Sequence, residues 1–549
     1  MRAYPLNDVK YFTRFRDMVD GLACGNEDKP ALSWFTRKGE QQGVTLGQWR
    51  QDILNLQQQL IHMGLAGKHI GILGENSYEW LVAYFAINCC GAVAVCVDIE
   101  QPDETIEQML QMADVEALFC SASAKEICQR YAQERMHVIS LSSDRELADI
   151  HQLMAQGAQI IAEGKADTEI EQSVTGDMAA SIVFTSGTTS LSKPVMLSQE
   201  AILTNASDSI ANVTIGKIVF TSLPFYHTYG LNCAVIAMML SGAHVFINGN
   251  LKTVMRDLEL SKADTLLTVP LMLETIHNKM WAAAEEAGKA DGLRKLLKLR
   301  KILMALGIRK NFKKLEQLRE KCFHSLNLVI CGGANMNSAI IEQFYYMGLL
   351  VVQGYGITEC APLISVNRNK MFKFESVGLV SRHSEVKIVD GEIWVRGKNV
   401  MMGYYKQPEL TAEAMDGEWF KTGDLGELHK DGFLYITGRK KNLIVFKNGK
   451  KLSPEKLEEQ IKKIPYVQDV VVYGISSGVT SDDVQVAASI YPNKQITEGM
   501  NSYDILETLQ REISQINQGL PMYQQVQMVD IREQEFSKTA LQKIKRHMI

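Results

Sequence analysis

The chain has 549 residues, of which 46% are apolar and 22% are charged, a balance close to that of soluble globular proteins. This composition excludes a disordered chain and a fibrous repeat, and the length excludes a small binding module. The 58 basic and 63 acidic residues give a net charge of −5. Because no basic excess is present to neutralise phosphates, nucleic acid is not expected as a partner.

The cysteines and the N-terminus predict a cytoplasmic protein. The ten cysteines include no C-x-x-C pair, so a structural zinc site is not expected. Cys89, Cys90 and Cys96 lie among apolar residues, as thiols of a reduced cytosolic chain do. The N-terminus lacks the apolar core of a signal peptide. The most apolar stretch, Leu81–Val97, is too short and too interrupted for a membrane span.

The first several hundred residues alternate between strand-like and helical patterns. Leu81–Val97 fits a buried helix over Glu79–Cys90, followed by a strand over Ala92–Val97. Other short β-rich runs are HIGIL from His69, ALFC ending at Cys120, HVISL from His137, HVFIN from His244 and LNLVIC ending at Cys331. Such alternation predicts α/β layers with largely buried sheets.

The pattern changes near Val386 to short strands punctuated by glycine, which predicts a β-rich subdomain. The tail combines a helix over Ser453–Lys463, an alternating strand over 467–475 and a helix over Tyr503–Gln518. The predicted fold class is therefore α/β, with a large N-terminal domain (residues 1–438) and a small α+β C-terminal domain (residues 439–549).

The segment Leu293–Lys321 departs from the average charge. It has eleven Lys or Arg against two Glu, a local charge of +9, and leucines at 293, 296, 297, 299 and 303. This spacing is partly helical. Two interpretations stay open: a basic amphipathic helix that lies on an anionic bilayer surface, or a solvated basic face over the core.

The segment Ser181–Ser198 predicts a phosphate-binding loop. Six of the seven residues Thr185–Leu191 are Thr, Ser or Gly, and Lys193 follows. Small hydroxylated residues let backbone N–H groups and hydroxyls converge on phosphate oxygens, and a lysine supplies the counter-charge. It is not a Walker A loop, because Ser192 and Pro194 replace residues that such a loop requires. The alternative is a Ser/Thr-rich hairpin.

A second block, QGYGITE at Gln353–Glu359, offers an aromatic face for a base, a hydroxyl for a phosphate and a carboxylate for a hard cation. With this block and the loop, the chain resembles the adenylate-forming enzymes: acyl-CoA synthetases, aryl-CoA ligases, beetle luciferases and nonribosomal-peptide adenylation domains. The resemblance extends to WFKTGDL at Trp419–Leu425, YITGRKKN at Tyr435–Asn442 and FSKTALQKIKR at Phe536–Arg546. The stretch Gly391–Thr411 matches a further block that is mainly structural.

The resemblance implies a role for each matching residue in the large domain. The loop would grip the pyrophosphate end of ATP through Thr185, Ser186, Gly187, Thr188, Thr189 and Lys193. Adenine would lie against Gly332, Gly333, Ala334, Tyr355 and Gly356. Thr358 would bind the α-phosphate, and Glu359 would bind Mg²⁺. His227, in LPFYHTYGL at Leu223–Leu231, would abut the reacting carboxylate, although a lone histidine is more often structural.

The resemblance also assigns residues towards the end of the chain. Asp424 would accept hydrogen bonds from the ribose diol, and Arg439 would be a second nucleotide contact. Lys441 falls on the family hinge, about which the mobile C-terminal domain rotates. Lys543 maps onto the catalytic lysine, and Lys545 is the alternative candidate.

The predicted function is ATP-dependent activation of a carboxylic acid through acyl-AMP, followed by transfer to the thiol of coenzyme A, with ATP, Mg²⁺ and coenzyme A as cofactors. No Asp stands between Pro224 and Leu231 to hold an ammonium group, so an uncharged acyl group, that of a fatty acid, is expected. The length, the basic stretch and NGKKLSPEKLEE from Asn448 resemble the fatty-acyl branch. The alternatives are a carrier-protein pantetheine acceptor, an aryl acid, and a non-catalytic nucleotide-binding scaffold. Peripheral contact with the inner membrane surface is a further expectation.

Overall fold

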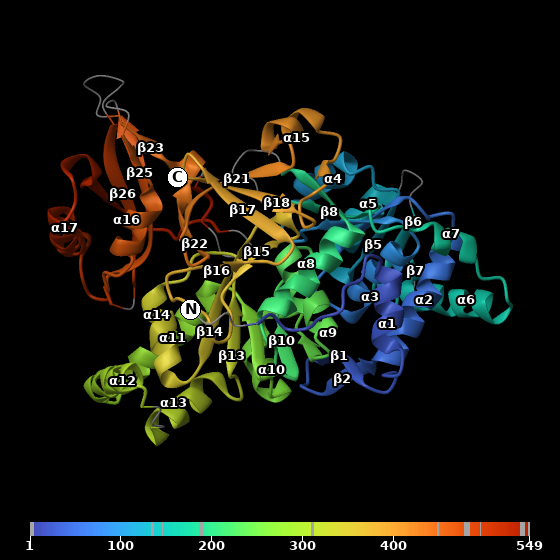
Figure 1. Cartoon of the computed structure of the whole chain (residues 1–549), viewed down its shortest axis with the longest axis horizontal. Helices are drawn as coiled ribbons and strands as arrows, with labels where there is room; N and C mark the ends of the chain where they lie inside the picture. The colour runs from blue at the N-terminus through green and yellow to red at the C-terminus, as the bar shows by residue number, and fades with distance from the viewer. Residues whose placement is uncertain are drawn as a thin grey trace. The chain divides into compact units, whose positions relative to one another are not determined.

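The computed structural model describes residues 5–132, 137–144, 146–185, 192–308, 312–446, 450–476, 484–494, 496–538 and 544–546. Their contacts divide the chain into two compact units. Figure 1 shows the chain coloured by residue number. Unit 1 consists of Met1–Glu385 and Val395–Phe420, and unit 2 consists of Val386–Trp394 and Lys421–Ile549. The domain boundary expected at residues 438/439 stays a prediction.

One sheet of unit 1 is parallel at its centre, through β8, β4, β3, β5 and β6. Its order is β19 (Gly403–Tyr404), β9 (Pro194–Ser198), β8 (Ala179–Phe184), β4 (Val93–Val97), β3 (His69–Leu73), β5 (Ala117–Cys120), β6 (His137–Ser140) and β7 (Ala148–Asp149). The strands predicted from apolar runs at His69, Cys120 and His137 are confirmed as β3, β5 and β6. Such runs are typical of strands that are covered on both faces.

The second sheet of unit 1 is parallel from β14 to β11. Its order is β16 (Gly378–Val380), β15 (Leu363–Val366), β14 (Leu350–Gly356), β13 (Leu328–Cys331), β12 (Thr265–Thr268), β10 (Ile218–Thr221), β11 (His244–Ile247), β1 (Pro30–Phe35) and β2 (Gln41–Thr45). The parallel strands place their carboxyl ends at one edge of the sheet.

Helices cover these sheets (Figure 1). Their bounds are α1 (Phe15–Ala23), α2 (Leu46–His62), α3 (Tyr78–Cys89), α4 (Asp103–Met112), α5 (Lys125–Ala132), α6 (Ile150–Ala162), α7 (Thr168–Ser173), α8 (Gln199–Asn212), α9 (Ala237–Leu240), α10 (Val254–Ser261), α11 (Pro270–Glu286), α12 (Ala290–Ala305), α13 (Lys313–Phe323), α14 (Ser338–Met347) and α15 (Pro408–Ala414). The helix predicted over Glu79–Cys90 is confirmed as α3, which begins after Ser77, whose hydroxyl accepts a hydrogen bond from the N–H of Trp80. Among the described residues, no helix is both long and apolar enough to cross a membrane.

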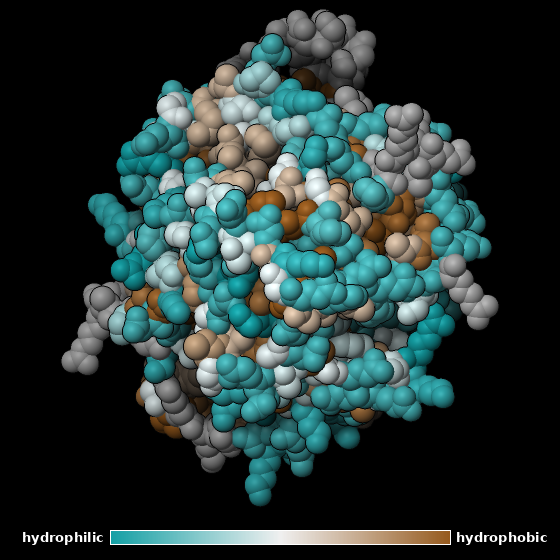
Figure 2. Space-filling model, turned by 90° about the vertical axis from the view of Figure 1, so that its right-hand side faces the viewer, coloured by the Kyte–Doolittle hydropathy of each residue, from teal (hydrophilic) through white to brown (hydrophobic). Residues whose placement is uncertain are grey.

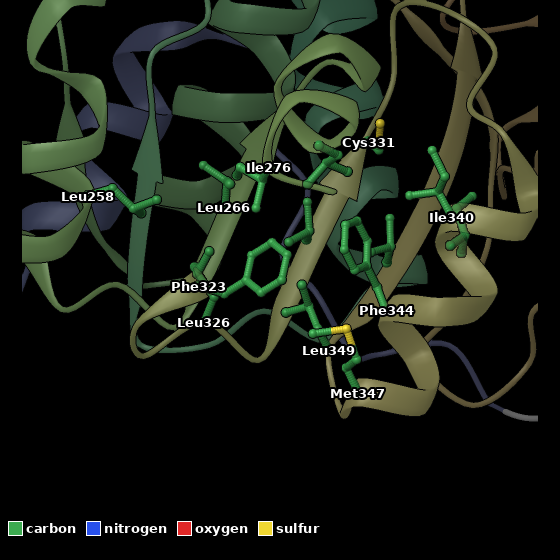
Figure 3. Packing of buried hydrophobic residues seen from close by; sticks show 14 of the residues in the cluster. Leu258, Leu266, Ile276, Phe323, Leu326, Cys331, Ile340, Phe344, Met347 and Leu349 are labelled. Carbon is green, nitrogen blue, oxygen red and sulfur yellow. The ribbon is translucent and has the colours of Figure 1, made fainter. Parts of the chain in front are cut away.

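A hydrophobic cluster fills the space between the second sheet and the helices α10 to α14 (Figure 3). The rings of Phe323 and Phe344 meet edge to face, with their centroids 4.9 Å apart. Leu266 on β12 and Met347 on α14 belong to the same cluster. On another side of the molecule, near α6 and α7, hydrophilic residues predominate and hydrophobic ones are scattered (Figure 2).

The remaining elements agree with the predicted β-rich and α+β parts. The segment after Ser384 contains β17 (Ser384–Val389), β18 (Glu392–Gly397), β20 (Met415–Asp416), β21 (Trp419–Leu428) and β22 (Phe433–Arg439). Later elements are β23 (Ile444–Val445), β24 (Lys451–Leu452), α16 (Pro454–Ile461), β25 (Val467–Ser476), β26 (Val484–Pro492), α17 (Ser502–Gln518) and β27 (Val526–Ile531). β26 lies between β25 and β27, and α16 and α17 share a hydrophobic core with these strands.

Candidate active site

The carboxyl edge of the second sheet gathers three of the predicted site segments. His227 follows β10, Gly332 and Gly333 follow β13, and Tyr355 lies at the end of β14. β10, β12, β13 and β14 are parallel neighbours, so the residues after them emerge at the same edge. Ligands of open α/β sheets bind outside the carboxyl ends of the strands.

Tyr229 explains why glycine stands at position 332. Its hydroxyl donates hydrogen bonds to the carbonyl oxygens of Thr268, at 3.2 Å, and Ile330, at 3.0 Å. A Cβ atom on Gly332 would lie 3.1 Å from the Tyr229 ring, which is tighter than an ordinary contact. Gly333 has a φ of 85°, a conformation that other residues rarely adopt. The glycine pair therefore leaves a bare backbone surface beside this ring.

The chain turns sharply directly after Tyr355. Tyr355 is half-buried and lies opposite Ser365 of β15. A Cβ atom on Gly356 would lie 2.2 Å from the carbonyl oxygen of Pro362, so no side chain fits there. The N–H of Ile357 donates to the same oxygen at 3.0 Å. These contacts close a turn over residues 357–363, which carries Thr358 and Glu359.

The side chain of Asn205, on α8, forms hydrogen bonds with the backbone of this turn. Its amide group donates to the carbonyl oxygens of Cys360, at 3.2 Å, and Leu363, at 2.8 Å, and accepts from the N–H of Leu363 at 3.0 Å. The Asn205 side chain is buried. In a dry interior, such bonds are strong and the loss of a partner is costly.

Two further buried asparagines complete the support of the turn. Asn232, in the π-helix η2 (Tyr229–Ile236), donates to the carbonyl oxygen of Ala361 at 3.1 Å. Asn399 donates to the carbonyl oxygens of Cys360, at 3.1 Å, and Leu363, at 3.2 Å. The position of Thr358 and Glu359 is thus fixed by three neutral amide groups from separate parts of unit 1. We name Asn205, Asn232 and Asn399 the asparagine clamp.

Glu359 and Lys193 both contact Tyr404 of β19. The Tyr404 hydroxyl donates to Oε1 of Glu359 at 3.0 Å. Nζ of Lys193 lies 5.0 Å from the centroid of the Tyr404 ring, within the range of a cation–π contact. Burial raises the pKa of Tyr404, and the nearby carboxylate raises it further. The hydroxyl therefore stays protonated near neutral pH and continues to donate.

Thr185 and Lys193 form the base of the predicted phosphate loop. β8 and β9 are antiparallel, and the N–H of Thr185 donates to the carbonyl oxygen of Lys193 at 3.1 Å. Both ends of the loop are therefore fixed to the first sheet. Four predicted phosphate-binding residues lie outside the described residues: Ser186, Gly187, Thr188 and Thr189.

His227 lies in a segment that Asn76 fixes. The Asn76 side chain donates to the carbonyl oxygen of Leu223 at 2.8 Å and accepts from the N–H of Phe225 at 2.9 Å. The N–H of His227 donates to the carbonyl oxygen of Pro224 at 3.2 Å. The imidazole is half-buried. Its expected contact with the acid stays a prediction.

In unit 2, Asp424 and Arg439 lie opposite each other on β21 and β22. Nε of Arg439 lies 2.8 Å from Oδ1 of Asp424, and the Asp424 side chain is 4% exposed whereas that of Arg439 is 41% exposed. The N–H of Asp424 donates to the hydroxyl of Thr422 at 3.0 Å. The structure thus brings together the two residues expected to contact the nucleotide from this part of the chain.

The expected hinge residue, Lys441, lies in the short helix η5 (Lys440–Asn442). The start of α16 contacts the chain on both sides of it. The Ser453 hydroxyl donates to the carbonyl oxygen of Thr437 at 2.8 Å, and the Asn442 amide donates to Glu455 at 2.6 Å. These bonds lie within unit 2. The hinge function of Lys441 stays a prediction.

Lys543 lies outside the described residues, but the preceding chain is firmly attached to unit 2. Nζ of Lys538 lies 2.7 Å from Asp469 and 3.1 Å from Glu535. Burial would lower the pKa of Lys538, but these two carboxylates raise it above the ordinary value. Lys538 therefore stays charged.

The chain after Lys543 is also attached. The N–H of Lys545 donates to the carbonyl oxygen of Ser537 at 2.8 Å. Arg546 forms an ion pair with Glu458 of α16 and donates to the carbonyl oxygen of Val472 at 3.1 Å. Burial raises the pKa of Glu458, although Arg546 opposes this rise. The described residues on either side of positions 539–543 are thus fixed to unit 2.

Family models match most of the chain. The model of the AMP-binding enzyme matches residues 22–405, and the model of the AMP-binding enzyme C-terminal domain matches residues 441–549. The chain belongs to the AMP-binding enzyme family. This membership confirms the resemblance to adenylate-forming enzymes.

Two bacterial relatives illustrate the similarity of this AMP-binding enzyme to curated proteins. It is 28% identical, over 451 residues, to the long-chain-fatty-acid–CoA ligase FadD15 of Mycobacterium bovis, and the match covers 76% of this chain and 72% of that ligase. It is 29% identical, over 329 residues, to the long-chain-fatty-acid–CoA ligase of Escherichia coli O157:H7. That match covers 56% of this chain and 52% of that ligase.

Solved structures confirm the predicted fold. An anthranilate CoA ligase in complex with anthranoyl-AMP has a TM-score of 0.78 at 18% identity, with 99% of this chain and 97% of that chain covered. The o-succinylbenzoate CoA synthetase of Bacillus subtilis in complex with its acyl-adenylate intermediate has a TM-score of 0.73 at 20% identity. The match covers 96% of this chain and 97% of that chain.

The side chains of this AMP-binding enzyme fit the expected magnesium ion. Among the described residues, no three His, Cys, Asp or Glu side chains converge on a metal site. Mg²⁺ does not need such a cage, because it keeps several waters and binds one or two carboxylates together with substrate phosphates. Glu359, positioned near Lys193 by Tyr404, is a carboxylate of this kind.

Sequence reasoning missed Tyr404 and the asparagine clamp. Tyr404 belongs to the stretch Gly391–Thr411, which was interpreted as mainly structural, and the two-residue strand β19 has no periodicity to detect. Buried asparagines have no recurring pattern either. Asn205 lies in α8, whose sequence QEAILTNASDSIAN already has eight polar residues among fourteen, so no signal in the sequence set it apart.

Proposed function

We propose that this AMP-binding enzyme activates a fatty acid with ATP and transfers the acyl group to coenzyme A. The observation that carries the proposal is the contact of both Glu359 and Lys193 with Tyr404. An anionic ligand for a cation and a cation for phosphates then lie on either side of one tyrosine. The names of both curated relatives support a fatty acid and coenzyme A as substrates.

In the first half-reaction, a carboxylate oxygen of the acid bonds to the α-phosphorus of ATP, and the bond from this phosphorus to pyrophosphate breaks. Lys193 and Lys543 offset the phosphate charge, and the Thr358 hydroxyl binds the α-phosphate. Mg²⁺ bound to Glu359 would neutralise further phosphate charge. His227 orients the carboxylate, and Asp424 binds the ribose.

In the second half-reaction, the thiol loses its proton, its sulfur bonds to the acyl carbon, and AMP leaves with the electron pair of the broken C–O bond. A carboxylate is a poor electrophile, whereas the acyl group of acyl-AMP has a good leaving group. Thiol access after adenylation requires Lys543 to leave the phosphates. We therefore propose Lys441 as the hinge for a rigid-body rotation.

The chemistry of the thiols supports a cytoplasmic location. None of the ten cysteines forms a disulfide, and eight of them are buried. Burial raises the pKa of the Cys90 thiol to about 12 and that of the Cys233 thiol likewise, so both behave as inert core groups. Free, buried thiols are typical of a reducing compartment.

The test is acid-dependent exchange between ATP and pyrophosphate with a panel of carboxylic acids. A maximum with long aliphatic acids supports the proposal, a maximum with benzoates favours an aryl acid, and the absence of exchange with every acid contradicts it. A second assay offers coenzyme A and pantetheine-loaded carrier protein as acceptors for the acyl group. Transfer to the carrier protein alone would replace coenzyme A in the proposal.

A further inference from the structure

Helix α12 is anchored to unit 1 by one of its sides. The Leu297 side chain is 7% exposed and belongs to the hydrophobic cluster of Figure 3. Leu293 and Leu296 are partly buried and pack against the same cluster. These three leucines of the basic segment therefore face the core, which satisfies their apolar surface.

A different side of α12 exposes large aliphatic residues. Leu299, Ile302 and Leu306 are 46%, 50% and 69% exposed. Their spacing of three and four residues places them on one helical face, with Leu306 at the C-cap directly after α12. Ile308, two residues beyond this cap, is 48% exposed and extends the apolar surface. We name Leu299, Ile302 and Leu306 the apolar stripe. Exposed aliphatic residues that gather in this way, rather than singly, mark an interaction surface.

Positive charge borders the apolar stripe. Lys295 and Lys298 are exposed, and no acidic side chain of the described residues lies within ion-pair distance of either. Other basic residues of the helix are already paired: Arg294 lies 2.8 Å from Asp291, and Lys301 lies 2.8 Å from Glu342. The unpaired charge thus lies next to the apolar stripe.

We propose that α12 lies in the surface of an anionic lipid bilayer. Leu299, Ile302 and Leu306 enter the acyl region, and Lys295 and Lys298 contact the phosphates of the headgroups. An apolar face with lysines at its border has the chemistry of an interfacial helix. The lysine side chains are long enough to reach the headgroups while their stems stay in apolar surroundings.

A second copy of the chain fits this surface less well than lipid. A stable dimer buries about 800 Å² per partner, which three side chains of one helix do not supply. A two-fold contact would also bring the positive charges of Lys295 and Lys298 from both copies into one small interface. An anionic surface instead complements their charge.

The location of α12 has a consequence for substrate supply, and only this consequence rests on the proposed function. A long-chain acid partitions into a bilayer, so an enzyme bound there meets its substrate at the surface where it is concentrated. The membrane contact itself does not depend on which reaction the enzyme catalyses.

The test is co-sedimentation of the full chain with vesicles of equal parts phosphatidylcholine and phosphatidylglycerol, without substrates. Three variants are compared: Leu299→Gln/Ile302→Gln/Leu306→Gln, Lys295→Gln/Lys298→Gln, and the control Met255→Gln/Leu260→Gln. The control residues are 45% and 44% exposed and lie on α10, so it removes similar apolar surface elsewhere.

We expect the apolar variant to bind at least about tenfold more weakly at low and high salt, because its apolar contact is lost. The lysine variant should bind roughly ten- to thirtyfold more weakly at low salt, with a smaller effect at high salt, since each charge contributes about fivefold before screening. The control variant should bind like the wild type.

The proposal is overturned if the wild type does not sediment with these vesicles at low salt, or if the apolar and control variants bind equally well. It is also overturned if the wild type is a dimer in solution that the apolar variant dissociates. ATP–pyrophosphate exchange with a water-soluble acid should be the same in all variants. Absence of exchange in a wild type that still sediments with the vesicles would count against the proposed function alone.

Discussion

The turn 357–363 of unit 1 and the tail segment 536–546 of unit 2 both adjoin predicted catalytic residues, but they are fixed by different forces. The turn is bonded by the uncharged amide groups of the asparagine clamp. The described parts of the tail segment, residues 536–538 and 544–546, are fixed by ion pairs, such as the one between Lys538 and Asp469. Neutral amides do not titrate, whereas ion pairs respond to pH and salt.

The difference indicates which part of the site is permanent scaffold. A buried amide network has one satisfied geometry and resists displacement. Ion pairs tolerate changes of distance, because Coulomb forces fall slowly with separation. We therefore expect the turn that carries Glu359 to be insensitive to pH and salt, and the described chain beside Lys543 to be sensitive to both.

The largest expected effect comes from the tail. Lys543→Ala should slow acyl-AMP formation by about 10²–10³-fold, because it removes a charge that stabilises the transferring phosphate. Conversion of supplied acyl-AMP to thioester should continue. Rapid-quench assays of each half-reaction measure both rates. Lys545→Ala is the matched control and should retain both steps. Equal losses in both half-reactions of Lys543→Ala would rule out this assignment.

The turn should be most vulnerable at Asn205. Asn205→Leu should lower the free energy of unfolding of unit 1 by about 2–3 kcal/mol, because the N–H of Leu363 loses its bond to Asn205 and two carbonyl groups keep only Asn399 as a side-chain donor. The rate constant kcat for acyl-AMP formation should fall more than KM for ATP rises.

Urea denaturation and initial-rate kinetics measure both effects of Asn205→Leu. Ser209→Ala, on the same helix, is the control, because its hydroxyl meets only the carbonyl oxygen of Asn205, at 2.9 Å, and the Cys233 sulfur, at 3.9 Å, and the expected cost is below about 1 kcal/mol. If Asn205→Leu left kcat unchanged in a folded protein, the clamp would have no part in positioning the turn.

A smaller effect is expected at the ribose contact. Asp424→Ala should raise KM for ATP by roughly 10–150-fold, because a charge-assisted hydrogen bond contributes about 1.5–3 kcal/mol. The unfolding midpoint should change little, since Arg439 is 41% exposed and remains hydrated. Steady-state kinetics over a range of ATP concentrations measure the effect. Unaltered ATP kinetics in a folded variant would exclude Asp424 as the ribose ligand.

The smallest effect tests the pH sensitivity of the tail. The folded pKa of Lys538 is raised above the ordinary 10.5, so its stabilisation is complete below about pH 10.5 and is lost as the pH rises through the folded value. The free energy of unfolding of the wild type should exceed that of Lys538→Met by about 1–2 kcal/mol at about pH 8. Urea denaturation at several pH values should show this difference shrinking towards about pH 11. Asn205→Leu, measured alongside, should show a constant difference. A pH-independent effect of Lys538→Met would remove the contrast between the two regions.

Strands and local motifs were predictable because their signals are contiguous in the sequence. The buried runs at His69 and Cys120 are β3 and β5, and the motifs that follow β13 and β14 emerge at the expected edge of a sheet. The asparagine clamp was not predictable. Asn205 and Cys360 are separated by 155 positions, and an amide that bonds backbone leaves no complementary residue type to search for.

The basic segment Leu293–Lys321 also could not be interpreted fully from its sequence. Charge and leucine spacing left two interpretations of Leu293–Lys321 open. Leu297 faces the core and Leu299 faces outward, so α12 covers the core with one side, and the bilayer contact of its other side stays a prediction. Periodicity alone could not separate the sides, because it reports which residues share a face and not what covers that face.

Tyr404 lets a single side chain serve two opposite charges. Its ring face contacts the cation Lys193, and its hydroxyl binds the anion Glu359. The two charges are thus joined through one uncharged side chain. A substitution that moves this ring would therefore disturb the predicted magnesium ligand and the predicted phosphate contact together.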